Sequence, residues 1–191
     1  MAGRSRRCAT APKALGFDES EIVLLFPDGP GEAALWLDEW ADRRMLAALE
    51  AMDLPAMKVR RRVAAAVEAR LLALAPYREA VRRAIALKAT PWGALKAAQI
   101  LYRTVDAIWY AAGDTATDFN FYTKRSLLAA VYTPTILYWL NDRSEGAADT
   151  AAFFDRRLAE VMKLPRLGEE LRKAAKRVTT PFQLFRREAR R

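Results

Sequence analysis

The sequence predicts an all-α protein, and three observations lead to this prediction. Of the 191 residues, 52% are hydrophobic, Ala, Leu and Arg are abundant, and only 8 Gly and 9 Pro are present, which favours helices. No stretch alternates apolar and polar residues clearly enough to indicate a β-strand. Helix start and stop signals recur between the apolar segments. The length suits one domain with a small appendage, and not two large domains.

The residue types exclude several kinds of chemistry. The chain has no His and a single Cys, Cys8, so His-based acid–base catalysis, His/Cys metal sites and a disulfide within one chain are excluded. We expect no catalytic residue, no metal and no cofactor. Asp114 and Asp118 are the only clustered carboxylates that an enzyme hypothesis would nominate. The longest charge-free apolar run, residues 126–141, is shorter than a bilayer span and contains Pro134, so it predicts a buried or cavity-lining helix.

The first 45 residues predict a short helix, a turn and the start of a longer helix. The stretch ALGFDESEIVLLFPDGPGEAALWLDEW resembles the second half of a TetR-type helix-turn-helix. A preceding first helix looks missing or incomplete, and MAGRSRRCATAPK, with four cations, is either a frayed first helix or a targeting peptide. We therefore interpret residues 1–45 as a degenerate helix-turn-helix remnant.

The charge of this remnant argues against DNA binding. Residues 14–42 contain no Lys or Arg but eight acids, Asp18, Glu19, Glu21, Asp28, Glu32, Asp38, Glu39 and Asp42. A recognition helix meets phosphates with cations or free amides, so these acids would oppose DNA. We predict no binding to nucleic acid, and a TetR-type transcriptional regulator remains the alternative function.

Helical patterns fill residues 46–164. The first covers about 57–75, and the second starts near Tyr77, after Pro76. The apolar stripe of the first consists of Val59, Val63, Val67, Leu71 and Leu74. Both carry an Arg-rich face that we expect to be solvated, comprising Arg60, Arg61, Arg62, Arg82 and Arg83. Thr90 and Pro91 give an N-cap and a first helical position for a strongly apolar helix over 92–112, which Gly113 ends.

Two more helix starts follow Gly113. Thr117 and Asp118 precede an apolar helix over about 124–140, and Asp149 and Thr150 open a last helix. Residues 109–125 therefore form a corner between two helices. Its Asp114 and Asp118 are placed to satisfy free amides and to favour the positive end of the second helix. We prefer this structural role over catalysis.

Residues 165–191 predict a basic amphipathic helix. From Lys163 onward ten cations face three acids, which gives a net charge of +7. An apolar stripe recurs every three or four residues at Leu167, Leu171, Ala174, Val178, Phe182 and Phe185. Such a helix suits an anionic membrane interface, and the residues expected to contact it are Leu171, Val178, Phe182, Phe185, Lys176 and Arg177. The alternative is a terminal helix docked on the protein's own core.

One block of sequence resembles a known family. VDAIWYAAGDTATDFNFYTKRSLLAAVYTPTILYWLND, residues 105–142, followed by DTAAFFDRRLAEVM, resembles the Coq-nine family of ubiquinone-biosynthesis accessory proteins. The pattern WYxAGDxxTDFNxYTxR carries the resemblance. It implies a TetR-like helical bundle that has lost DNA binding, that is not an enzyme, and that binds isoprenoid quinone intermediates or phospholipid between its C-terminal helices.

The resemblance also implies partners and a location. The partner would be the demethoxyubiquinone hydroxylase, of Coq-seven type, docked through Asp106, Trp109 and Tyr110. One of these aromatics would be core if the docking role does not carry over. The protein would lie peripherally on the cytoplasmic face of a bacterial inner membrane, or on the matrix side in mitochondria, either as a monomer or as a homodimer. Candidates for the lipid cavity wall, for each of which core packing is equally expected, are Leu101, Ile108, Leu128, Val131, Tyr132 and Thr135.

Overall fold

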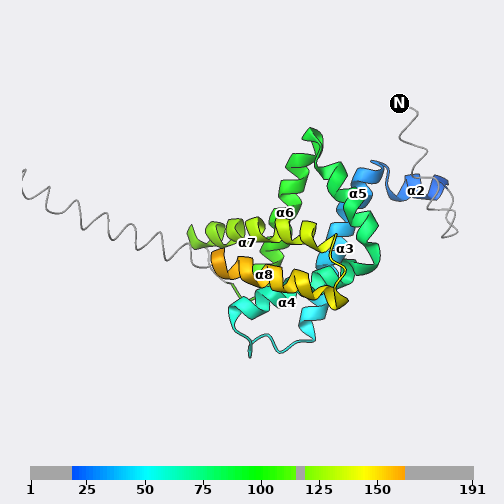
Figure 1. Ribbon diagram of the computed structural model, residues 1–191. Coiled ribbons are helices and arrows are strands. Elements are labelled where there is room, and N and C mark those ends of the chain that lie inside the picture. The colour runs from blue at the N-terminus through cyan, green and yellow to red at the C-terminus, as the bar shows by residue number, and fades with distance from the viewer. Residues whose placement is uncertain (1–18, 115–118, 162–191) are drawn as a thin grey trace, which may run out of the picture.

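The computed structural model describes residues 19–114 and 119–161, and this part of the chain is helical without a β-strand. Figure 1 shows the helices as a bundle with α2 at its edge. The predicted all-α fold is confirmed. The helices are α2 (Glu19–Leu25), α3 (Pro30–Glu50), α4 (Val59–Leu74), η2 (Ala75–Tyr77), α5 (Arg78–Lys88), α6 (Pro91–Ala111), α7 (Phe119–Trp139), η3 (Glu145–Ala147) and α8 (Ala148–Val161).

One apolar core joins α3 to α8. The long helix α3 packs along α4, α6 packs on α7, and α7 packs on α8 (Figure 1). Three consecutive alanines of α4, residues 64–66, are buried and let neighbouring backbones approach closely. Because α3 continues to Glu50, the predicted segments 1–45 and 46–164 share one helix. Large core side chains include Met45, Val67, Ile108, Leu128, Trp139 and Phe154.

The start of α6 follows the predicted capping chemistry. Thr90 accepts a hydrogen bond from the amide of Gly93 at 3.2 Å, and Pro91 occupies the first helical position. A Cβ on Gly93 would lie 2.7 Å from the carbonyl oxygen of Leu87. Glycine at this position therefore permits the tight turn from α5 into α6.

Two of the arginines that were expected on a solvated face bind carbonyl groups at helix ends. Arg61 and Arg83 are exposed and pair with glutamates, as expected. Arg62, however, is half-buried and donates to the carbonyl of Ala112 at 3.0 Å, and Arg82 donates to the carbonyl of Leu140 at 2.9 Å. A guanidinium satisfies the free carbonyls and complements the negative end of a helix. The prediction of a solvated face is therefore wrong for half-buried Arg62, whereas Arg82 is exposed as expected and makes this contact from the surface.

Candidate functional site

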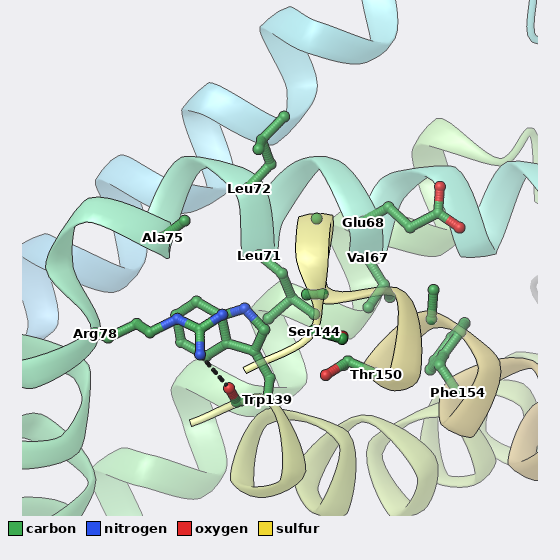
Figure 2. Close-up of a pocket in the computed structure, with 13 residues that line it drawn as sticks. Val67, Glu68, Leu71, Leu72, Ala75, Arg78, Trp139, Ser144, Thr150 and Phe154 are labelled. Carbon is green, nitrogen blue, oxygen red and sulfur yellow. Dashed lines mark hydrogen bonds between the residues drawn. The ribbon is translucent and has the colours of Figure 1, made fainter. Parts of the chain in front are cut away.

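The main candidate is an apolar cavity of about 230 Å³ between α4, the end of α7 and α8. Figure 2 shows its walls. Val67 and Leu71 of α4 face Phe154 of α8 across it, and Trp139 forms its base. The remaining lining residues are Glu68, Leu72, Ala75, Arg78, Ser144, Gly146, Ala147, Thr150 and Ala151.

Arg78 covers one face of the indole of Trp139. Its guanidinium carbon lies 4.5 Å from the ring centroid, and Nη1 donates to the carbonyl of Trp139 at 2.9 Å (Figure 2). Nη1 also donates to the carbonyl of Asp142 at 2.5 Å. The stacking is a cation–π contact, and the hydrogen bonds close the C-terminal end of α7. Arg78 thus fixes the tryptophan that forms the base of the cavity.

Most other polar groups at the cavity are already engaged. Glu68 accepts two hydrogen bonds from Arg61, at 2.7 and 3.1 Å. The hydroxyls of Ser144 and Thr150 donate to Asp142 at 2.6 and 2.5 Å. A ligand in the cavity would therefore meet mainly apolar surface, because few donors or acceptors remain for a polar molecule.

Asp142 organises the corner between α7 and α8. The residue is buried, and its carboxylate also accepts hydrogen bonds from the amides of Ser144 at 2.8 Å and Thr150 at 2.9 Å. Burial alone would raise the pKa of Asp142, but the hydrogen bonds from Ser144 and Thr150 outweigh it and lower the pKa to about 2. The start signal for α8 was predicted at Asp149 and Thr150. The carboxylate that satisfies the amide at the start of α8 instead comes from Asp142.

The lowered pKa of Asp142 predicts a loss of stability in acid. An unfolded aspartate titrates near pH 3.9, so ionised Asp142 stabilises the fold above that pH, and the stabilisation disappears as the pH falls through about 2. We expect ionised Asp142 to stabilise the fold by about 2 kcal/mol at neutral pH and by roughly half of that near pH 3. The free energies of unfolding of wild type and Asp142→Asn in urea, compared at both pH values, measure this stabilisation. A difference between the two proteins that does not change with pH would contradict the assignment.

A second cavity, of about 330 Å³, lies where the start of α3 meets α5 and α6. Its lining includes Asp28, Glu32, Lys88 and Lys96. Charged walls of both signs suit an apolar ligand poorly, because their desolvation is costly. The first cavity is therefore the better lipid candidate.

The six residues predicted for a cavity wall line neither of these two cavities. Leu101 packs half-buried against the core, and the other five, Ile108, Leu128, Val131, Tyr132 and Thr135, are at most 4% exposed. They hold α6 and α7 in the bundle. Their role as a lipid wall stays a prediction that would need a different arrangement of these helices.

Tyr132 belongs to a buried polar network that the sequence did not suggest. Arg70 of α4, 1% exposed, donates to the hydroxyl of Tyr132 at 2.5 Å and to Asp42 of α3 at 2.7 Å. Burial raises the pKa of Tyr132 to about 12, so its phenol stays neutral. Burial would lower the pKa of Arg70, but Asp42 and Asp38 outweigh it and raise the pKa.

The same network extends to two more helices. Asp38 of α3 accepts from Arg70 at 3.2 Å and also from Lys88 of α5. Thr104 of α6 donates to Asp42 at 3.0 Å. Two cations and two carboxylates thus meet inside the bundle, and they join α3, α4, α5, α6 and α7.

The predicted corner between α6 and α7 is a second polar cluster. Gly113 ends α6 with a positive φ of +84°. Its amide donates to the carbonyl of Tyr110 at 2.9 Å, and the amide of Asp114 donates to the carbonyl of Trp109 at 3.0 Å. Asp114 accepts from Lys124 at 2.6 Å and from Arg125 at 3.3 Å. Both partners lie on α7, so the expected structural role of Asp114 at this corner is observed, and these two cations are among its partners. Asp118 lies outside the described residues.

Gly113 gives a direct test of this corner. Alanine at Gly113 would adopt a left-handed conformation and bring its Cβ within 3.0 Å of Nη1 of Arg62. Gly146, at φ +60°, is a matched control, because its Cβ would meet nothing within 4 Å. We expect Gly146→Ala to cost about 1 kcal/mol from backbone strain, and Gly113→Ala about 1 kcal/mol more. Equal losses in urea unfolding would show that the contact with Arg62 is unimportant.

The predicted docking residues separate in the structure. Trp109 is 8% exposed, and its Nε1 donates to the carbonyl of Lys124 at 3.1 Å. Tyr110 is 78% exposed. Asp106 accepts a hydrogen bond from buried Arg125 at 2.5 Å while its side chain stays 44% exposed. In this arrangement Tyr110 and Asp106 are accessible to a partner, whereas Trp109 anchors α6 to α7.

The predicted membrane-contact residues, Leu171, Lys176, Arg177, Val178, Phe182 and Phe185, lie outside the described residues. Within the described ranges, no helix is both long enough and apolar enough to cross a bilayer.

Part of the chain is similar in sequence to proteins of one known family. Residues 94–165 match the model of the COQ9 family. The human mitochondrial ubiquinone biosynthesis protein COQ9 is 36% identical over 107 residues, which are 56% of this chain and 34% of the human protein. The Drosophila melanogaster COQ9 is 39% identical over 99 residues, 52% of this chain and 30% of that protein. The chain thus spans about a third of the length of these curated relatives.

The comparison with solved structures concerns the whole bundle. The crystal structure of the TetR transcriptional regulator from Nitrosomonas europaea is similar, with a TM-score of 0.64 and 26% identity. The similarity covers 78% of this chain and 82% of the regulator. The expected TetR-like fold is therefore confirmed. The resemblance to the COQ9 family is confirmed as well, over a segment that contains most of α6, all of α7 and all of α8.

Proposed function

We propose that this chain is a lipid-binding accessory protein of ubiquinone biosynthesis. It binds isoprenoid quinone intermediates at the membrane and presents them to the demethoxyubiquinone hydroxylase, without catalysis of its own. One observation carries the proposal: the COQ9-like segment supplies Trp139, Ala151 and Phe154 to the apolar cavity. The segment that resembles a ubiquinone-biosynthesis family thus builds a site suited to an apolar ligand.

The size of the cavity indicates how much of a lipid it holds. Ligand pockets generally measure about 300–1,000 Å³, and this one measures about 230 Å³. A polyprenyl quinone is much larger, so only one part of it enters. The rest of the molecule stays in the bilayer, which requires the protein to work at the membrane surface.

The contacts of Asp114 support an accessory role. Asp114, the carboxylate that an enzyme hypothesis would use, is paired with Lys124 and Arg125 on α7. A carboxylate held by two cations is a weak base and a poor acid at neutral pH. The reaction itself is therefore assigned to the partner enzyme.

The proposed location is the membrane face that carries ubiquinone biosynthesis. The amphipathic segment 165–191 is the proposed contact, because its cations attract anionic lipid and its apolar stripe enters the interface. The curated relatives are named as mitochondrial proteins. The matrix side in mitochondria, or the cytoplasmic face of a bacterial inner membrane, fits the proposal.

The direct test is to identify what the protein carries. Protein purified without detergent is extracted with organic solvent, and the extract is analysed by mass spectrometry alongside flotation with phosphatidylglycerol vesicles. We expect an isoprenoid quinone or phospholipid in near-stoichiometric amount, and flotation that weakens at high salt. An extract without lipid, together with no flotation, would refute the proposal.

Exposed Tyr110 is proposed to dock the hydroxylase. Exposed aromatics are frequent interface hot spots, and truncating one typically costs about 2 kcal/mol or more. We therefore expect Tyr110→Ala to weaken binding to the purified hydroxylase by about 30-fold or more. Tyr102→Ala, two turns earlier on α6 and 43% exposed, is the control. Equal binding of Tyr110→Ala and wild type in calorimetry would remove Tyr110 from the interface.

A TetR-type transcriptional regulator remains the second candidate, because the similar solved structure is such a regulator. The charge around α2, the helix that would contact DNA, argues against this candidate. This helix lies within residues 14–42, which contain eight acids and no Lys or Arg. Salt-sensitive binding of random duplex DNA at micromolar protein would support this candidate. We expect no such binding.

A further inference from the structure

The mouth of the apolar cavity carries exposed apolar side chains. Leu72, which is 74% exposed, and Ala75, which is also exposed, line the cavity where α4 ends. Figure 2 shows Leu72 pointing away from Trp139, the base of the cavity. Pro76 and Tyr77 follow directly and are exposed as well. Exposed apolar groups at the opening of an apolar cavity indicate a binding surface.

Tyr77 connects this mouth to two tryptophans on α3. Its ring packs edge-on against that of Trp40, with 5.3 Å between the two ring centroids. Trp36 lies one turn earlier on α3 and is 49% exposed. Residues four apart lie on the same side of a helix, so the two indoles and the phenol of Tyr77 form one aromatic surface beside the mouth.

Two arginines on the same side of α3 lie over these indoles. The guanidinium carbon of Arg44 lies 5.6 Å from the ring centroid of Trp40, and that of Arg43 lies 6.0 Å from the ring centroid of Trp36. Both arginines are exposed. Each arginine can therefore keep its cation–π contact while its guanidinium faces outward to an anion.

The acids of α3 do not cancel this positive charge. Glu39 is paired with Arg103 of α6, with 2.8 Å between oxygen and nitrogen. Glu50 is exposed, but it is a single acid at the end of α3, two turns beyond Arg43. Arg43 and Arg44 together thus leave this side of α3 basic.

The opposite side of the mouth has a different charge. The segment between α7 and α8, with the start of α8, carries two exposed acids, Glu145 and Asp149, against one exposed arginine, Arg143. An anionic surface is attracted to cations and repelled by acids. The α3 side of the mouth therefore suits such a surface better than the α8 side.

The aromatic and basic side chains beside the mouth are called the mouth surface. Its members are Leu72, Tyr77, Trp36, Trp40, Arg43 and Arg44. We propose that the mouth surface lies on an anionic bilayer and opens the cavity toward the lipid chains. Indole and phenol rings suit the interface between lipid and water, and guanidinium groups bind lipid phosphates.

This inference rests on the proposed function and adds a second membrane contact to residues 165–191. The cavity of about 230 Å³ holds only part of a polyprenyl lipid, so the remainder passes through the mouth. If the mouth faces the bilayer, this remainder stays among lipid chains. A mouth that faces water would instead expose a long apolar chain, which is unfavourable.

Spin labels on the full-length protein test the contact. The native thiol is removed by Cys8→Ser, and a nitroxide is attached at Leu72→Cys or, as the control, at Ser126→Cys, which is exposed on α7. Collisions of each label with oxygen, which concentrates in lipid, and with a water-soluble nickel chelate are measured with and without phosphatidylglycerol vesicles. On adding vesicles, the label at Leu72→Cys should lose nickel collisions and gain oxygen collisions, whereas the control label should change in neither.

Three results would overturn the inference. The label at Leu72→Cys could keep its nickel collisions although the protein sediments with the vesicles, or the protein could fail to bind the vesicles. Spin–spin broadening at Leu72→Cys before vesicles are added would instead show that a second copy covers the mouth surface. Lipid in solvent extracts of the same protein would, in each case, leave the proposed lipid binding intact.

Charge variants test the role of the two arginines. Arg43→Gln with Arg44→Gln should weaken binding to phosphatidylglycerol vesicles about 30-fold, or roughly fivefold for each arginine. Arg156→Gln with Arg157→Gln removes the same charge from exposed positions on α8 and is the matched control. It should change binding by less than about twofold. Equal weakening by both pairs would show that total charge, and not the mouth surface, determines binding, and would contradict the inference.

Discussion

Replacement of Arg70 by methionine is expected to lower the free energy of unfolding by about 3–5 kcal/mol. The guanidinium is 1% exposed and binds Asp42, Asp38 and Tyr132. Without it, Asp42 loses its cationic partner and Asp38 keeps Lys88 alone of its two cations, so the cost of incompletely compensated buried charge follows. For a chain of this size the melting temperature should fall by roughly 10 °C or more.

Two further variants define the cause of this loss. Arg70→Lys keeps the charge but provides a single ammonium in place of a planar group with several donors, so most of the destabilisation should remain. Arg61→Met removes an arginine whose side chain is 56% exposed on the same helix and should cost less than about 1 kcal/mol. A stable Arg70→Met protein would show that the network contributes little.

Filling the apolar cavity is expected to abolish lipid binding. Ala151 of α8 lines the cavity between Thr150 and Phe154. An indole at this position would occupy much of the roughly 230 Å³ available. We therefore expect Ala151→Trp to lose at least 90% of the co-purified lipid, measured by mass spectrometry of solvent extracts, whereas overpacking itself should cost about 1–3 kcal/mol.

The matched control places the same side chain elsewhere. Leu95→Trp adds an indole at a residue that is 72% exposed on α6 and lines neither cavity. It should keep the lipid content of wild type. If Ala151→Trp remains folded and still carries lipid at wild-type level, the ligand lies elsewhere in the molecule. The core residues Ile108, Leu128 and Val131 would then be the next candidates for the lipid-binding wall, reached when their helices move apart.

The helices could be predicted because their signals are local. Thr90, Pro91 and Gly113 act within one turn, and the structure begins and ends α6 next to them. The stripe that ends at Leu74 likewise predicted α4. The start of α8 was predicted within two residues, at Asp149 and Thr150. The source of its cap was not predicted, because the amide of Thr150 is satisfied by Asp142, eight residues earlier.

The buried network could not be predicted, since it depends on tertiary contacts. Arg70 lies on a helix rich in arginine, and its residue type alone does not distinguish it from exposed Arg61. Its partners are 28 and 62 residues away, on α3 and α7. One signal was present: Arg70 falls between the stripe residues Val67 and Leu71, on the buried face of α4.

The candidate cavity was not predicted from the sequence, because none of the six predicted wall residues lines it, whereas the docking residues were nominated from the family resemblance. Adjacent aromatics on a helix point in different directions, about 100° apart, so one of Trp109 and Tyr110 had to be more buried than the other. Only the packing against α7 shows that it is Trp109. The cavity combines α4, α7 and α8, and the sequence alone did not reveal that Val67 and Phe154 share it.

The quinone content of cells that lack this protein tests the central claim most directly. Deletion of its gene, followed by chromatography and mass spectrometry of extracted quinones, should show a fall in ubiquinone and accumulation of the demethoxy intermediate, because the hydroxylase loses its supply of substrate. The wild-type gene should restore the profile, and a gene encoding Ala151→Trp should not. An unchanged quinone profile in the deletion strain would contradict a role in ubiquinone biosynthesis.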